Sequence, residues 1–162
     1  MSKNCIWLTL DSPELQDIII DLAERFNSPV FQAHCTIIGR IDRPIIKLKS
    51  AIVQLANNLE LDCVDIKSIS YSENIWKSYY LELKEKHNLI ELHEQFCNIL
   101  SIEKDNEFLP HISLMYNLIS EKFKQSISIP IKIGASFKIH SIQITECGEE
   151  VERWKPIFEL KV

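Results

Sequence analysis

The sequence predicts an α+β protein in which short strands and helices alternate along one domain of 162 residues. Two observations favour this class. Some stretches carry apolar residues at helical spacing, whereas others are short runs of β-branched and aromatic residues that are typical of strands. They follow one another as strand-helix-strand-helix-strand-strand-helix-strand-helix-strand-strand, which is a mixed pattern. No Gly-rich or low-complexity linker divides the chain, so we expect a single domain over residues 1–162.

The first half of the chain carries clear start and stop signals. We expect strands at residues 5–10 and 33–38, and helices from residue 13 and at residues 46–59. Ser12 suits the N-cap of the first helix and Pro13 its first helical position. Apolar residues then recur at helical spacing up to Phe26, and the segment 27–29 (Asn-Ser-Pro) closes the helix. Gly39 is expected to end the second strand.

The second half continues the alternation. We expect strands at residues 61–71 and 75–83 around a polar turn at 72–74, helices at 88–100 and 120–128, and strands at 109–116, 136–145 and 154–162. His93 lies on the apolar stripe of the helix at 88–100, which predicts a partly buried side chain rather than a reactive one.

Charge and composition narrow the class of ligand. The net charge is -5 and the pI is about 5.6, and no block of Lys or Arg occurs. Proteins that hold long nucleic acids usually present broad basic surfaces, so we expect a small or terminal phosphate substrate and no duplex binding. Only three glycines are present, which excludes Gly-rich phosphate loops. We expect no cofactor, and nothing in the sequence predicts more than a monomer.

The cysteines and the N-terminus bear on the cellular compartment. Five widely spaced cysteines without a C-x-x-C pair fit reduced thiols better than a disulfide framework or a zinc site. The first residues contain only a short apolar run followed by an acid, unlike a signal peptide. No apolar stretch approaches the ~18 residues of a membrane span. We therefore expect a cytoplasmic protein.

Two tetrads of similar pattern carry the chemistry. Residues 34–37 read His-Cys-Thr-Ile and residues 111–114 read His-Ile-Ser-Leu, each within a predicted strand and each before a predicted helix. Their near half-chain spacing suggests an internal twofold relation. Because side chains alternate along a strand, each His shares a face with the hydroxyl residue two positions later. If the strands are neighbours or face each other, two imidazoles and two hydroxyls converge on one cavity.

That set of groups suits displacement at a phosphate ester. One neutral imidazole can take a proton from an attacking water, while an imidazolium protonates the leaving oxygen. The hydroxyls of Thr36 and Ser113 can donate to the non-bridging phosphate oxygens. His34 and His111 are therefore the candidate catalytic residues. A strained cyclic phosphate needs little further help, so no metal is expected, and the acids do not cluster around the histidines as metal ligands would.

Four further residues have two interpretations each. Trp7 can stack on a nucleobase or pack in the core. Arg40 shares the strand face of His34 and can touch phosphate or lie at a solvated strand end. Tyr116 lies on the face opposite His111 by strict alternation, so it reaches the site only if the strand bends. Cys35 is adjacent to His34, which suggests a nucleophile, but strand alternation points its side chain away from that histidine, so it is expected in the core.

The paired tetrads resemble those of the two-histidine (LigT-like) phosphoesterase superfamily, which is defined by two H-x-T/S-aliphatic motifs. The segment 109–116, Leu-Pro-His-Ile-Ser-Leu-Met-Tyr, is most similar to the second motif of the plant and fungal cyclic phosphodiesterases. The opening Ile-Trp-Leu at 6–8 and the Cys-Gly and Trp-Lys pairs at 147–148 and 154–155 are also similar. The resemblance implies two pseudo-symmetric lobes, whose antiparallel sheets face a central groove with helices packed outside.

The resemblance also implies an activity. The similar enzymes open 2′,3′-cyclic nucleotides and ADP-ribose 1″,2″-cyclic phosphate, with the histidines as acid–base pair, the hydroxyls as phosphate ligands and the tyrosine against the base or sugar. RNA ends with a cyclic phosphate are related substrates. Two alternatives stay open: a phosphodiesterase for 2′-5′-linked or cyclic oligonucleotides, and a non-catalytic module that binds terminal phosphates of RNA. Arg40 follows the first motif here, which leaves the substrate class less defined than the superfamily.

Overall fold

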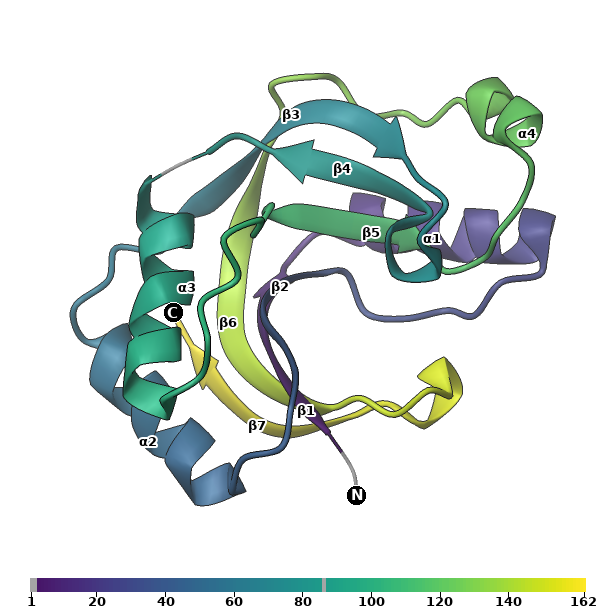
Figure 1. Cartoon of the computed structure of the whole chain (residues 1–162). Helices are drawn as coiled ribbons and strands as arrows, with labels where there is room; N and C mark the ends of the chain where they lie inside the picture. Colours follow the sequence, from purple (N-terminus) through teal and green to yellow (C-terminus); the bar gives the residue numbers. More distant parts are fainter. Residues whose placement is uncertain (1–2, 86) are drawn as a thin grey trace.

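A computed structural model describes residues 3–85 and 87–162 (Figure 1). In that part of the chain the strands are β1 (Asn4–Leu10), β2 (His34–Ile41), β3 (Cys63–Tyr71), β4 (Tyr79–Leu83), β5 (His111–Met115), β6 (Ser136–Glu146) and β7 (Lys155–Lys161). The α-helices are α1 (Pro13–Phe26), α2 (Ile45–Ala56), α3 (His87–Leu100) and α4 (Glu121–Ser126). Short 3₁₀ helices, η1 (Ile75–Lys77) and η2 (Val151–Arg153), precede β4 and β7.

The strands form an antiparallel sheet that closes on itself. Its order is β1-β2-β5-β4-β3-β6-β7, and β1 also pairs with β6, so six strands make a ring and β7 lies at its outer edge. The pairing between β2 and β5 is short, with Cys35 opposite Ile112. Figure 1 shows β3, β4 and β5 on one side and β1 and β7 on the other, with the curved β6 joining them. The predicted α+β class with facing antiparallel strands is confirmed.

The first helix shows how local sequence fixes an element. The Ser12 hydroxyl accepts from the backbone N–H of Leu15, and Pro13 begins the helix as expected. Asn27 ends it in the left-handed conformation with φ of 50°, which Asn tolerates better than most residues. The apolar residues at helical spacing form its buried face. This face packs against β5, one of the strands that carry a tetrad.

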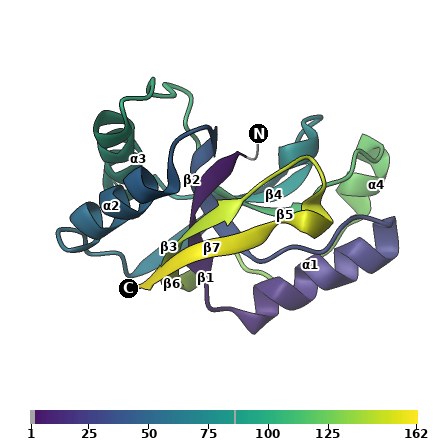
Figure 2. The ribbon, with the colours of Figure 1, turned by 90° about the horizontal axis from the view of Figure 1, so that it is seen from below.

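The helices lie outside the ring, in two groups (Figure 2). The pair α2 and α3 pack against each other, and α3 covers β2, whereas α1 covers β5. Each of the two tetrad strands is therefore backed by a helix from the other half of the chain. This exchange agrees with the internal twofold relation suggested by the tetrads. No helix in the described ranges is long and apolar enough to cross a membrane.

Three element boundaries differ from the prediction by three residues or more. The second strand runs through Gly39 to Ile41, because Gly39 keeps an ordinary negative or extended φ and does not turn the chain. The expected strand at 75–83 begins with the 3₁₀ helix η1, because the Asn74 side chain accepts from the backbone N–H of Trp76 and starts a turn. The second helix ends at Ala56 rather than at residue 59. The first two differences affect the site.

Candidate active site

Both tetrad histidines are fixed through the same ring nitrogen. Nδ1 of His34 lies 2.6 Å from the Gln32 carbonyl oxygen, and Nδ1 of His111 lies 2.8 Å from the Leu109 carbonyl oxygen. Since a carbonyl only accepts, each Nδ1 carries the hydrogen, and Nε2 is the basic nitrogen of the neutral ring. The carbonyl belongs in each case to the residue two positions before the histidine. The two motifs therefore share this hydrogen bond as well as their sequence pattern.

Aromatic rings hold the two imidazoles in place. Trp7 on β1 stacks on the ring of His34, with 3.6 Å between centroids and 14° between planes. Tyr80 on β4 meets the ring of His111 edge-on at 5.5 Å. Trp7 is 3% exposed and His34 4% exposed, so this pair lies almost wholly inside the protein. The face of Trp7 that touches His34 is therefore already occupied.

Burial favours the neutral form of both histidines. Burial is the main reason that the pKa of His34 is lowered to about 4. The hydrogen bond to the Gln32 carbonyl acts to raise this pKa, and the charge of His111 acts to lower it. The pKa of His111 is also lowered, first by burial and then by the nearby ammonium of Lys77, while the bond to Leu109 acts in the opposite direction. At neutral pH the empty site therefore contains two neutral imidazoles.

The two hydroxyl residues differ in their contacts. Ser113 is buried, and its hydroxyl donates to the Trp76 carbonyl at 2.8 Å. Thr36 is half-buried and lies two residues after His34 on the same strand face. For Ser113 to donate to a phosphate oxygen, its hydroxyl has to turn away from Trp76.

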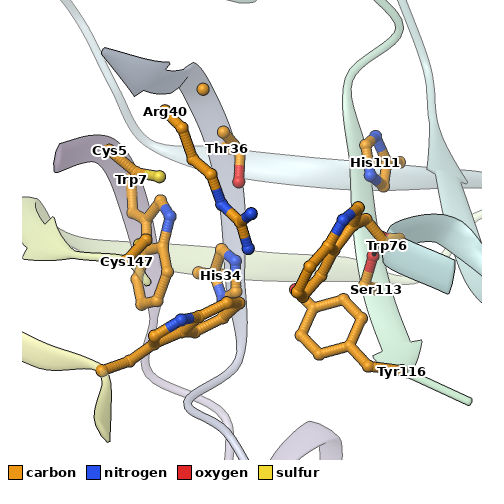
Figure 3. Close-up of a pocket in the computed structure, with 12 residues that line it drawn as sticks. Cys5, Trp7, His34, Thr36, Arg40, Trp76, His111, Ser113, Tyr116 and Cys147 are labelled. Carbon is orange, nitrogen blue, oxygen red and sulfur yellow. Dashed lines mark hydrogen bonds between the residues drawn. The ribbon is translucent and has the colours of Figure 1, made fainter. Parts of the chain in front are cut away.

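One cavity of about 310 Å³ collects these side chains from both halves of the chain (Figure 3). Figure 3 shows His34, Thr36 and Arg40 along β2 on one side, and His111, Ser113 and Tyr116 along β5 on the other. All seven residues that the sequence predicts to be catalytic, phosphate-binding or substrate-binding line this cavity. The lining consists of Cys5, Trp7, His34, Thr36, Gly39, Arg40, Trp76, His111, Ser113, Tyr116, Cys147 and Trp154. The arrangement can hold a compact anion between two imidazoles.

Register shifts bring Arg40 and Tyr116 to the cavity. In β5, Ser113 pairs with Tyr80 but Met115 pairs with Tyr79, so Leu114 is an extra residue and redirects the end of the strand. This is the bend that Tyr116 requires. Two such shifts occur in β2 between Thr36 and Ile41, and together they preserve the face on which Arg40 lies. Burial raises the pKa of Tyr116, so its hydroxyl stays protonated.

Cys35 and His93 lie where the sequence predicts. Cys35 is fully buried in the apolar core on the face away from the cavity, and burial raises its pKa to about 12, so it is not a reactive thiol. His93 is 6% exposed on α3, where its ring stacks on Phe108 at 4.1 Å.

Among the residues that the structure describes, no group of three or more His, Cys, Asp or Glu is arranged to hold a metal ion.

Five lining residues were not among the seven site candidates from the sequence: Cys5, Gly39, Trp76, Cys147 and Trp154. For Trp76 the sequence left both the core and the groove lining open. Trp154 reaches the cavity between η2 and β7, and Trp76 reaches it from η1 rather than from a strand. All three tryptophans of the chain therefore line the cavity. Cys5 and Cys147 lie in its wall, where hydrogen bonding between the two thiols lowers the pKa of Cys5 and raises that of Cys147. The signal available in the sequence was the small number of tryptophans, each next to a turn or a tetrad strand.

Comparison with known proteins gives the family. Residues 6–162 match a protein family described as cyclic phosphodiesterase-like protein. The chain belongs to this family. Membership supports the predicted superfamily of two-histidine phosphoesterases, while the plant and fungal branch stays a prediction. A comparison with curated proteins found no match.

Solved structures confirm the fold of this cyclic phosphodiesterase-like protein. TT0787 of Thermus thermophilus superposes with a TM-score of 0.68 at 14% identity, covering 98% of this chain and 97% of that one. E. coli LigT in its apo form gives 0.63 at 12% identity, covering 99% and 98%. LigT complexed with 3′-AMP gives 0.65 at 14% identity, over 99% and 98% of the two chains. At these identities the likeness shows a LigT-like fold.

Proposed function

We propose that this protein hydrolyses 2′,3′-cyclic nucleotides or related cyclic phosphates by acid–base catalysis with His34 and His111, without a metal. One observation carries the proposal: both imidazoles line one cavity, and each has its Nδ1 bound to the backbone, which leaves Nε2 for the substrate. Membership of the cyclic phosphodiesterase-like family supports the reaction type.

The proposed reaction needs one histidine in each protonation state. Nε2 of the neutral imidazole takes a proton from water as the water oxygen forms a bond to phosphorus. Nε2–H of the imidazolium gives its proton to the leaving ribose oxygen as that ester bond breaks. The two rings end with exchanged protonation states, and exchange with solvent restores them. Because both rings present Nε2 in the same way, either histidine can act as the base.

Binding of the anionic substrate favours the imidazolium that the reaction needs. Both pKa values are lowered by burial in the empty site, so an anionic phosphate between the rings favours protonation of one of them. The hydroxyls of Thr36 and Ser113 then donate to the non-bridging oxygens, where donors aimed at developing charge contribute about 3 kcal/mol each.

The rest of the cavity suits a nucleoside. Tyr116, Trp76 and Trp154 contribute aromatic rings on which a base can stack, worth about 1–3 kcal/mol for each base. Trp7 takes part by supporting His34, and Arg40 lies close enough to the cavity to reach a phosphate oxygen. E. coli LigT has been solved with 3′-AMP, NADP+ and ATP, which supports a small nucleotide as the ligand of this fold.

The test is turnover of 2′,3′-cyclic AMP in EDTA by the wild type, His34→Ala and His111→Ala. Each substitution is expected to lower kcat by at least about 100-fold, because it removes a proton-transfer group. His140→Ala is the matched control, since His140 lies on β6 outside the cavity and pairs with Glu159. Equal activity in all four proteins would refute the proposal.

The product and substrate range decide among the alternatives. Chromatography that separates 2′- from 3′-phosphates shows which ester bond is cut. A panel of 2′-5′-linked and cyclic oligonucleotides tests the related phosphodiesterase activities. Tight binding of the product with no turnover of any compound would indicate a module that binds terminal phosphates.

A further inference from the structure

A second cavity adjoins the one that contains both histidines. Its volume is about 390 Å³, and it shares four lining residues with the first: Thr36, Gly39, Arg40 and His111. The remaining wall consists of Lys77 on η1, three isoleucines of β2, part of α3 and residues of the segment 102–109. A ligand whose phosphate lies between Thr36 and His111 can therefore extend directly into this second space.

Lys77 is the notable residue of the second cavity. Its ammonium lies 5.2 Å from the centre of the Tyr80 ring, which in turn meets the ring of His111. In the part of the chain that the structure describes, it forms no ion pair with a carboxylate. The positive charge of Lys77 lowers the pKa of His111 and so disfavours its imidazolium form. An anion bound at Lys77 would offset that repulsion, so a ligand phosphate beside this ammonium is compatible with a protonated His111.

The charges around the cavity limit what this ligand can be. Arg40 brings a second cation from β2, and its guanidinium lies 4.1 Å from the centre of the Trp76 ring. By contrast, the segment 102–109 contributes three exposed carboxylates, from Glu103, Asp105 and Glu107. One phosphate near Lys77 is favourable, whereas a row of phosphates that continues past the acidic segment is repelled.

We propose that the Lys77 side of this second cavity binds one additional phosphate of the same ligand whose cyclic phosphate lies between the histidines. This inference rests on the proposed function and narrows its substrate class. The preferred ligand is a nucleotide with a cyclic phosphate and one further phosphate group. That group is either a terminal monoester or the phosphodiester of a short oligonucleotide end, and the acidic segment selects against long chains.

Binding of stable product-like probes tests this without any turnover. Calorimetric titration compares adenosine 2′-monophosphate with adenosine 2′,5′-bisphosphate. We expect the wild type to bind the bisphosphate about tenfold more tightly, the value of one hydrogen bond to a charged group. Lys77→Met is expected to reduce this preference below about twofold, and Lys77→Arg to keep most of it. Lys132→Met, an exposed lysine away from both cavities, is the control that keeps the wild-type preference.

Turnover distinguishes the two sources of the phosphate. The values of kcat/KM are compared for 2′,3′-cyclic AMP, its 5′-phosphorylated form, and a dinucleotide and an octanucleotide that end in a 2′,3′-cyclic phosphate. A gain for the 5′-phosphate indicates a monoester site, and a gain for the dinucleotide alone indicates a diester site. The octanucleotide should gain nothing over the dinucleotide.

The outcomes separate this inference from the function on which it rests. If no cyclic phosphate is turned over but the bisphosphate preference depends on Lys77, the proposed reaction fails and the phosphate site stands. If Lys77→Met lowers kcat/KM by the same factor for every substrate, or keeps the full bisphosphate preference, the second phosphate site is overturned. Far-UV circular dichroism of each variant verifies that it is folded.

Discussion

Each tetrad histidine has one ring nitrogen bound to a backbone carbonyl two residues before it. This bond fixes the tautomer that catalysis needs, and it depends on the path of the chain through Gln32 and Leu109. Strand alternation in the sequence predicts that His34 and Thr36 share a face, as do His111 and Ser113. It does not predict how each ring is turned, because the carbonyl that turns it belongs to a loop.

The lowered pKa values of the histidines predict an acidic pH optimum. The profile of kcat/KM reports the acid and the base of the free enzyme, so its maximum lies between their two pKa values. Burial places both below the ordinary histidine value, that of His34 at about 4. We therefore expect maximal kcat/KM for 2′,3′-cyclic AMP below pH 6.5. A maximum above pH 7.5 in a steady-state pH series would contradict this assignment.

Stability is expected to fall in the same pH range. Between pH 6.5 and about 4 the unfolded chain binds a proton at His34 that the folded protein excludes, so the free energy of unfolding decreases as the pH falls. Above pH 6.5 the group contributes no pH dependence. The full effect is about 3 kcal/mol. Urea unfolding from pH 7 to pH 4 measures it.

Variants at the same position isolate the contribution of His34. In His34→Gln and His34→Phe the free energy of unfolding should depend less steeply on pH across that range, whatever the stability of each variant at pH 7. If both variants lose as much stability on acidification as the wild type, the buried neutral state of His34 is wrong.

At the scale of elements, irregular backbone brings several side chains to the cavity. Leu114 is an extra residue in β5 that turns Tyr116 toward the site, and η1 brings Trp76 there in place of a straight strand. The sequence pattern predicts where strands lie, and it identified the need for a bend at Tyr116. It cannot predict bulges, because an extra residue in one strand is defined only by the register of its partner.

The turn at η1 can be tested through its cap. The Asn74 side chain accepts from the backbone N–H of Trp76 at 2.9 Å, so Asn74→Ala leaves this donor without its partner. We expect a loss of about 1 kcal/mol in the free energy of unfolding and a higher KM, because Trp76 lines the cavity. Asn74→Asp keeps the acceptor and should retain most of both values. Equal losses in the two variants would show that the cap does not matter.

His93 connects three elements near the site. Its Nδ1–H donates to the Ile37 carbonyl in the irregular part of β2 at 2.8 Å, and its Nε2 accepts from the backbone N–H of Asp105 at 3.4 Å. His93→Leu leaves the buried carbonyl unpaired, and we expect a loss of about 1–3 kcal/mol in urea unfolding. His93→Gln offers a donor and an acceptor and should be less destabilised. The reverse order would contradict this role.

At the scale of the whole molecule, the sheet joins strands that are far apart in the sequence. The first strand, β1, pairs with β6 near the other end of the chain, and β2 pairs with β5, which places the two tetrads side by side in the sheet. Periodicity predicted the order of the elements and the α+β class. The facing of the two halves across a groove came only through the resemblance to a known fold, because no local signal encodes which distant strand is the partner.

The three tryptophans allow a test of the expectation that both halves form one domain. Trp7, Trp76 and Trp154 come from distant segments and all line the cavity, so tryptophan fluorescence reports the site, whereas far-UV circular dichroism reports the whole chain. If the chain unfolds as one unit, both signals give the same urea midpoint. A product nucleotide at about 100 times its Kd should raise the free energy of unfolding by about 2.7 kcal/mol in both signals. A fluorescence transition that precedes the dichroism transition, or a ligand that shifts only the fluorescence, would show two independently unfolding halves.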